Sequence, residues 1–356
     1  MVFGNIFTVS AYNTSARAAV VINGETGEIL YSQNCDERLP MASTTKIMTA
    51  LLLCELGGDL KTEIDTTREM VTVEGSSMGL QVGDKVSYHD LLYGMMLSSG
   101  NDAANTVAIS LGGSISGFAR LMNERAQKMG LENTRFVTPS GLDAERHYTT
   151  AYELALITKE ALANEQFAMA AAAKTARLCY GNPPYNRTLT NHNKLLNMYD
   201  DVVGVKTGFT SKSGRCLVSA SKKDGKLVIA VTLNDKNDWQ DHRNLLDLGL
   251  SLIESKVISP KKREYNVCIT NGETMNIVVP SATISVTKNS KVTYKIKLPQ
   301  FIYAPVKQGE AIGSVSYYCN DNLVCELPIS ATRDIDYKQS KLELFFETFK
   351  NLLLNI

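Results

Sequence analysis

The chain has 356 residues, more than one ordinary hydrophobic core organises, so the length favours two domains or a large domain with a smaller one. Lysine plus arginine (37) balance aspartate plus glutamate (37), which excludes the basic field that gathers nucleic-acid phosphates, so we expect no nucleic-acid partner. The sequence contains no apolar run of about 18 residues that would span a membrane, and its 7 cysteines form no CxxC pair, so we expect no metal site.

The first part of the chain is predicted to form sheet and then helix. Residues 1–15 are apolar at first and end in small side chains, and we expect a signal remnant or a disordered lead there. Residues 18–22 and 28–31 are β-prone runs joined by a turn-rich segment, which predicts a hairpin. From Ser43, apolar residues recur at spacings of three and four until Gly57, so a helix is expected to begin at Ser43.

The middle of the chain is predicted to be a helical region followed by a return to sheet. Between about 88 and 175, four segments carry an apolar stripe at helical spacing and a plausible stop. The β-prone runs are 202–206, 215–220 and 227–233, and a helix over 238–256 closes the first domain.

The last hundred residues are predicted to form a second, all-β domain and a final helix. From Lys261 to about Asp336 valine, isoleucine, threonine and tyrosine alternate with period two. Cys319 and Cys325 flank a predicted hairpin turn. They either form a disulfide across the hairpin or remain two ordinary buried thiols. We expect four segments: 1–15, the catalytic domain 16–257, the β-rich domain 258–336 and an amphipathic helix 337–356.

Ser43 and Lys46 lie three apart at the start of the predicted helix, which places hydroxyl and amine on one face within hydrogen-bonding reach. A serine hydroxyl becomes a good nucleophile when a base takes its proton, and lysine acts as that base when burial or a nearby cation lowers its pKa. Alone this pair is weak, because a capping serine followed by a solvated lysine has the same pattern.

Two further motifs stand in the order that the same chemistry needs. Ser99-Gly100-Asn101 is predicted to lie on a loop between two helices, and Lys206-Thr207-Gly208 at the end of a strand that can present groups to a bound peptide. The set S-x-x-K, S-D-N and K-T-G marks penicillin-binding proteins and class A β-lactamases. The three motifs, each in its expected context, are far more specific than any one of them.

With Gly100 in the middle motif, the chain resembles the low-molecular-mass penicillin-binding proteins that are D-alanyl-D-alanine carboxypeptidases. Segments outside the motifs, such as GLDAERHYTTAYELALI and TNHNKLL, are also similar to that family. The resemblance implies an α/β (α+β) fold: a β-lactamase/transpeptidase-like domain with an antiparallel sheet and a helical subdomain, then a small all-β domain. The final helix looks like the family's membrane anchor, while a helix packed on its own protein is the alternative.

The resemblance also implies a role for each motif residue. Ser43 is expected to be the acylated nucleophile, Lys46 its general base, and Ser99 the relay of a proton to the leaving D-alanine. The remaining assignments are substrate binding by Asn101, Lys206, Thr207 and Gly208, and an oxyanion hole made by the backbone N–H groups of Ser43 and Phe209. Lys206 is also expected to lower the pKa of Lys46 by repulsion of like charge.

Other polar residues are weaker candidates. Phe209 stands where relatives often have a polar residue, so only its backbone is assigned. His192 and Arg243 are candidates for a wall of the site with a surface role as the alternative, and His89 and His147 are interpreted as ordinary helix and loop residues.

The implied activity is removal of the terminal D-alanine from peptidoglycan stem pentapeptides, with acylation by penicillins and other β-lactam antibiotics, and without a cofactor. Stem peptides lie outside the cytoplasmic membrane, so we expect an exported enzyme, peripheral on the outer face of that membrane, that acts on the cell wall and cell shape. One alternative is a serine β-lactamase, but the E-x-x-L-N pattern that class A enzymes use for deacylation is absent between Asn101 and Lys206. The other is a catalytically silent peptidoglycan-binding scaffold, although Ser43, Lys46, Ser99 and Lys206 are all present.

Overall fold

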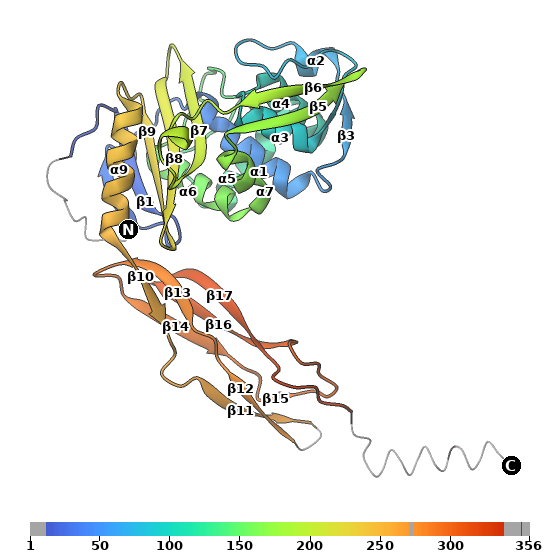
Figure 1. Cartoon of the computed structure of the whole chain (residues 1–356), viewed down its shortest axis with the longest axis vertical. Coiled ribbons are helices and arrows are strands. Elements are labelled where there is room, and N and C mark those ends of the chain that lie inside the picture. The colour runs from blue at the N-terminus through green and yellow to red at the C-terminus, as the bar shows by residue number, and fades with distance from the viewer. Residues whose placement is uncertain (1–11, 271–272, 338–349, 351–356) are drawn as a thin grey trace. The chain divides into compact units, whose positions relative to one another are not determined.

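The computed structural model describes residues 12–270, 273–337 and 350. The described residues divide into two compact units, of which the first ends at Glu254 and the second begins at Ser255. Figure 1 shows helices and a sheet in the first unit, and strands in the second unit up to Tyr337.

An antiparallel sheet is the centre of the first unit, and the predicted hairpin forms its first two strands. The sheet also contains the three strands predicted after residue 200, and the last of these hairpins turns at Asp224 and Gly225. The strands are β1 (Ala18–Asn23), β2 (Ile29–Gln33), β7 (Val202–Thr210), β8 (Gly214–Lys223) and β9 (Lys226–Leu233), in the order β2-β1-β9-β8-β7. β7 is therefore an edge strand.

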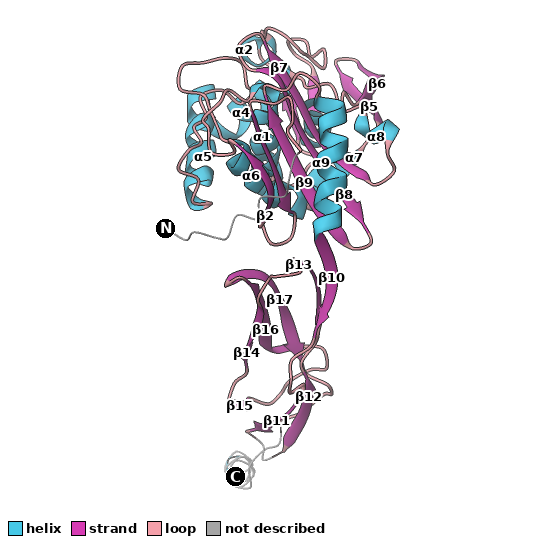
Figure 2. Ribbon diagram, turned by 90° about the vertical axis from the view of Figure 1, so that its left-hand side faces the viewer, coloured by secondary structure: helices cyan, strands magenta, loops and turns pink. Residues whose placement is uncertain are grey.

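Both faces of this sheet are buried, which explains why its strands are almost continuously apolar. Along β1, Ala18, Val20 and Ile22 belong to a core shared with the large helical group. Ala19 and Val21 point the other way and pack with leucines of α9 (Asp238–Leu252). Figure 2 shows α9 lying across one face of the sheet.

The helical region follows the prediction closely. Its helices are α1 (Lys46–Leu56), α3 (Tyr88–Met96), α4 (Asn101–Gly112), α5 (Ile115–Lys128), α6 (Ala151–Ala163) and α7 (Glu165–Ala172). The helix predicted from Ser43 differs at its start, because a 3₁₀ turn, η1 (Ala42–Thr45), precedes the α-helix proper. The helix predicted over 238–256 ends at Leu252, and the residues that follow form the strand β10 (Ile253–Ile258) instead.

Short elements that the sequence pattern did not predict complete the first unit. They include two two-stranded sheets that border the helical group. These elements are α2 (Arg68–Val71), β3 (Glu63–Asp65) with β4 (Lys85–Ser87), β5 (Thr175–Gly181) with β6 (Pro184–Thr190), and α8 (Leu195–Met198).

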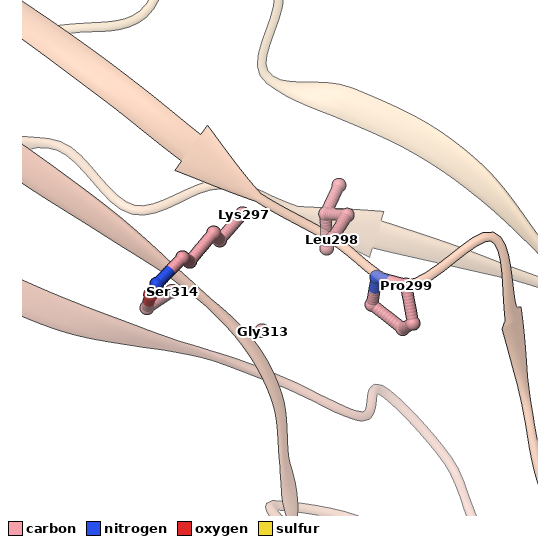
Figure 3. Close-up of a pocket in the computed structure, with 5 residues that line it drawn as sticks. All are labelled: Lys297, Leu298, Pro299, Gly313 and Ser314. Carbon is pink, nitrogen blue, oxygen red and sulfur yellow. The ribbon is translucent and has the colours of Figure 1, made fainter.

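Up to Tyr337, the described residues of the second unit contain strands and no helix, as its alternating pattern predicted, with a core of its own around Ile277, Val315 and Tyr317. A depression on this unit is lined by Lys297, Leu298, Pro299, Gly313 and Ser314 (Figure 3), none of which is a predicted site residue. The strands are β11 (Glu264–Ile269), β12 (Thr274–Val278), β13 (Ala282–Thr287), β14 (Val292–Lys297), β15 (Phe301–Ile302), β16 (Ala311–Cys319) and β17 (Asn322–Ser330).

The cysteine pair predicted at a hairpin does lie on one, but no disulfide forms. In the register of β16 and β17, Cys319 is opposite Asn322 and Cys325 is opposite Tyr317, so the two thiols do not face each other. All seven cysteines lie among the described residues, and none is in a disulfide. The predicted helix 337–356 and most of the predicted lead 1–15 lie outside the described residues.

A buried histidine predicts how the stability of the first unit depends on pH. His242 of α9 is fully buried between the hydroxyls of Ser219 and Thr232, and this burial lowers its pKa from 6.5 to about 3. Between pH 6.5 and about 3, His242 is therefore protonated in the unfolded chain and neutral in the folded chain. As the pH falls through this range, the free energy of unfolding decreases by up to about 1.4 kcal/mol per pH unit.

We expect His242→Gln, which keeps hydrogen-bonding groups but does not titrate, to flatten this pH dependence. Denaturant unfolding at pH 7, 6 and 5 measures it, with the half-buried His89→Gln as control. Equal slopes in wild type and His242→Gln would contradict the expectation.

Candidate active site

The predicted nucleophile lies at the start of the helix that carries its base. Ser43 is half-buried in η1, and Lys46, the first residue of α1, is fully buried. Ala42, directly before Ser43, has a φ of +48°, a conformation that residues with a side chain rarely adopt. Such backbone strain costs about 1–3 kcal/mol and is concentrated at functional sites.

Three oxygen atoms surround the amine of Lys46. Its Nζ lies 3.1 Å from Ser43 Oγ and 2.7 Å from both Asn101 Oδ1 and the carbonyl oxygen of Ser140. The amide and carbonyl oxygens only accept hydrogen bonds, so they hold two N–H groups of the amine. The remaining position of the tetrahedral nitrogen faces Ser43. In a neutral amine, that position is the lone pair that takes a proton.

The orientation of the Asn101 amide is fixed from its far end. Asn101 Nδ2 donates to the carbonyl oxygen of Glu74 over 2.6 Å, and a carbonyl accepts only from the amide nitrogen. Asn101 Oδ1 must therefore face Lys46. Both ends of the side chain are bonded within the protein, and Asn101 is 3% exposed.

Burial and a second lysine favour the neutral form of Lys46. The pKa of Lys46 lies well below its usual value, first because the side chain is buried and then because Lys206 is close; Asp102 acts in the opposite direction. Lys206 is itself 1% exposed, and burial lowers its pKa to about 7. A substrate carboxylate brought beside Lys206 would restore its charge, because an opposite charge favours the ionised form.

The edge strand β7 approaches the nucleophile at Gly208. A Cβ atom added there would lie 3.0 Å from the backbone nitrogen of Ser43 and 3.1 Å from the carbonyl oxygen of Met41. Only glycine allows this approach of two backbones. Phe209 follows Gly208 on β7, and 67% of its surface is exposed. Ser43 and Phe209, whose N–H groups are predicted to form an oxyanion hole, therefore belong to two backbone segments that adjoin at Gly208.

Ser99 is near this group but makes no hydrogen bond with it. It is buried between α3 and α4, as the sequence predicted for its loop, and its φ is +58°. Among the described residues we find no hydrogen bond that joins the Ser99 hydroxyl to Ser43, Lys46 or Lys206. Thr207 is half-buried on β7, and its carbonyl accepts a 3.0 Å hydrogen bond from Lys206 Nζ.

The weaker candidates separate into two groups. His192 is exposed beside the site, where partial burial and then the charge of Lys206 lower its pKa. Arg243 instead binds Asp201 and Asp247 and stacks on Tyr199, so it is an ion-pairing residue of α9 and not a wall of the site.

Two contributions were not predicted from the sequence. The Ser140 carbonyl holds Lys46, and a backbone oxygen leaves no residue-type signal. His147, interpreted as an ordinary loop residue, is buried: its Nε2 lies 2.9 Å from Thr45 Oγ1, beside the nucleophile motif, and burial lowers its pKa to about 4.

Comparison with known proteins finds a matching family model for each of the two units. Residues 5–237 match a family model described as D-alanyl-D-alanine carboxypeptidase, and residues 259–337 match one described as penicillin-binding protein 5, C-terminal domain. The chain is 31% identical to D-alanyl-D-alanine carboxypeptidase DacF of Bacillus subtilis (90% of this chain, 86% of the relative) and 32% identical to DacC of Escherichia coli (92% and 86%). Among solved structures it is similar to the D-alanyl-D-alanine carboxypeptidase DacD from Francisella tularensis, with a TM-score of 0.66, 26% identity and coverage of 94% and 96%.

The position of Lys206 predicts a shift in the pH dependence of Ser43 acylation. Because only the neutral amine of Lys46 accepts the serine proton, acylation should rise with pH through the pKa of Lys46. Lys206→Gln removes a cation that lowers this pKa, so the rise should move to higher pH. Acylation by a small nitrophenyl ester as a function of pH measures the shift, with the exposed Lys194→Gln as control. A rise at unchanged or lower pH would contradict the expectation.

Proposed function

The chain belongs to the D-alanyl-D-alanine carboxypeptidase family, and we propose that it removes the terminal D-alanine from peptidoglycan stem pentapeptides through an acyl-enzyme on Ser43. The observation that carries the proposal is the hydrogen bonding of Lys46 Nζ. Asn101 and Ser140 hold two of its positions, and the third faces the Ser43 hydroxyl.

In the acylation step, Lys46 takes the proton of Ser43 as Oγ attacks the carbonyl carbon between the two D-alanines. The negative oxygen of the tetrahedral intermediate is stabilised by the backbone N–H groups of Ser43 and Phe209; losing one such donor costs about 3–4 kcal/mol in other enzymes. Ser99 relays the proton that Lys46 has taken to the nitrogen of the leaving amine, which leaves Lys46 neutral again. The amide bond then breaks, and free D-alanine departs.

Lys206 and Thr207 hold the terminal carboxylate of the substrate, and Gly208 lets the strand that carries them lie close to the nucleophile turn. Asn101, expected from the resemblance to contact the peptide backbone, is instead assigned to orienting Lys46, because both ends of its amide are bonded inside the protein. In deacylation, Lys46 takes a proton from water, which attacks the ester on Ser43; the bond between Oγ and the acyl carbon breaks, Lys46 returns the proton to Oγ, and the shortened stem peptide leaves.

A β-lactam antibiotic undergoes the same acylation step, because its strained amide acylates Ser43 and its carboxylate binds Lys206. The family match, which covers most of the first unit, and the match of the second unit favour this function over a serine β-lactamase. The buried, hydrogen-bonded arrangement of Ser43, Lys46 and Asn101 favours an enzyme over a silent scaffold.

We also propose that the enzyme works outside the cytoplasmic membrane and is peripheral on its outer face, where its products affect the cell wall and cell shape. Stem peptides lie on that side. No helix in the described part of the chain is long and apolar enough to cross a membrane. The support for surface binding is the sequence of 337–356, which repeats apolar residues at helical spacing between charges of both signs.

Ser43→Ala is expected to abolish both penicillin binding and D-alanine release. Intact mass after incubation with benzylpenicillin should show one bound drug per wild-type chain and none on the variant, and release of D-alanine from diacetyl-Lys-D-Ala-D-Ala should fall by at least about 10³-fold. The exposed Ser251→Ala is the matched control. Adduct formation without D-alanine release would contradict the carboxypeptidase assignment, and rapid penicillin turnover without adduct would favour a lactamase.

Replacing Phe345, Phe346 and Phe349 by serine is expected to weaken membrane binding while D-alanine release stays unchanged, because apolar burial in the headgroup region drives binding of an in-plane helix. Co-sedimentation with phosphatidylglycerol vesicles measures it. The control is Phe301→Ser, an exposed aromatic outside this segment. Equal binding of the triple variant and wild type would overturn the anchor.

A further inference from the structure

An exposed segment without regular secondary structure lies beside the active site and is held by an unusual number of side-chain contacts. We call residues 74–80 the strap. Within it only Met78 and Leu80 are buried. The Met78 side chain occupies the space that a Cβ atom at Gly94 of α3 would need, 2.3 Å from its sulfur. The strap is therefore seated on the helical group by Met78 and Leu80, which both belong to its core, while polar groups elsewhere fix its backbone.

On one side, a single buried carboxylate binds the strap. Asp102, in the first turn of α4, is 0% exposed and accepts hydrogen bonds from the backbone N–H groups of Met78 (2.9 Å), Gly79 (3.0 Å) and Leu80 (3.0 Å). The hydroxyl of Ser77 donates to the same carboxylate over 2.5 Å. Bonds to an ionised acceptor are about twice as strong as neutral ones, so this group orders the strap strongly.

On the other side, an arginine from the β5–β6 hairpin binds the carbonyl groups of the same residues. Arg187 Nη1 donates to the carbonyl oxygens of Met78 (3.1 Å) and Gly79 (2.7 Å). Its guanidinium carbon lies 4.2 Å from the ring centre of Tyr180 and 4.1 Å from that of Tyr185, and Tyr180 also donates to the Met78 carbonyl over 2.7 Å. Stacking between two rings fixes the arginine plane.

The strap reaches the catalytic amine through one side chain. The Glu74 carbonyl accepts from Asn101 Nδ2 over 2.6 Å, and the Ser76 carbonyl accepts from the Asn101 backbone N–H over 2.7 Å. The Glu74 contact decides which end of the amide faces Lys46. If the strap moved away, the amide would be free to turn its NH₂ group towards Lys46, where it would compete with Ser43 for the lone pair.

We propose that Asp102 and Arg187 are positioning residues for acyl transfer: together they clamp the strap, and the clamped strap holds Asn101 in the orientation that directs the lone pair of Lys46 at Ser43. The inference rests on the proposed function, because it assigns Lys46 as the base. Among the described residues, no hydrogen bond joins either residue to Ser43, Lys46 or Lys206. Their effect passes through backbone groups of the strap.

The two positioning residues differ in their effect on the pKa of Lys46, so their variants should differ in how acylation depends on pH. The charged groups that act on Lys46 are Lys206 from β7, which lowers its pKa, and Asp102 from α4, which raises it. Asp102→Asn should therefore slow acylation and also move its rise with pH to lower pH. Arg187→Met should slow acylation without moving that rise. A variant that merely destabilised the fold would not move the pH at which acylation rises.

The experiment compares wild type, Asp102→Asn, Arg187→Met and the control Arg243→Met, which removes another ring-stacked arginine from the same unit. Hydrogen exchange of the Met78, Gly79 and Leu80 amides reports on the clamp without any substrate. We expect both strap variants to exchange at least about tenfold faster than wild type. We also expect acylation by benzylpenicillin to fall by at least about tenfold at the optimal pH, with the control close to wild type in both measurements.

Unchanged exchange in both strap variants would overturn the clamp. Faster exchange with unchanged acylation would overturn the positioning role, and so would a rise with pH that stays in place in Asp102→Asn. If Asp102→Asn does not fold, Arg187→Met alone decides both points. A wild type that benzylpenicillin does not acylate overturns the proposed function and the positioning role with it, whereas the exchange rates still report on the clamp.

Discussion

The site depends on one constraint, which is that an amine must stay neutral inside the protein and point its lone pair at a hydroxyl. Full burial of Lys46 supplies the first condition, because an unpaired charge is costly away from water. Acceptors at 2.7 Å on two of its positions supply the second. The 3₁₀ turn, the first residue of α4 and the loop at Ser140 all bring groups to this nitrogen. The surrounding fold holds these loops at fixed places.

The sheet makes that arrangement rigid. Its two faces pack into separate cores, so β7 cannot move away from η1 without disturbing both. Gly208 then sets the distance between the strand edge and the backbone of Ser43. Packing of the same cores maintains the strained φ angles of Ala42 and Ser99. The free energy that this packing contributes offsets the cost of the strain.

The sequence predicted the main strands, the main helices and the residues that surround Ser43, because these follow from periodicity and from side-chain type. It did not predict that Ser43 lies in a 3₁₀ turn or that the last helix of the first unit ends at Leu252, since boundaries depend on tertiary pairing. Ser140 acts through a backbone carbonyl, and Asp102 gains its partners from a segment more than twenty residues earlier. Neither contribution has a local pattern. Arg243 is a cation that could have lined the site, but its guanidinium forms ion pairs with Asp201 and Asp247 instead.

The contact of Gly208 with residues 41–43 also limits how much of the β7 edge is open. The backbone of residues 41–43 lies against this part of the edge, so less unpaired backbone of β7 is open to other chains. An edge strand that is partly covered is a poorer template for edge-to-edge pairing, and the closeness that the nucleophile turn requires therefore also protects the sheet against aggregation.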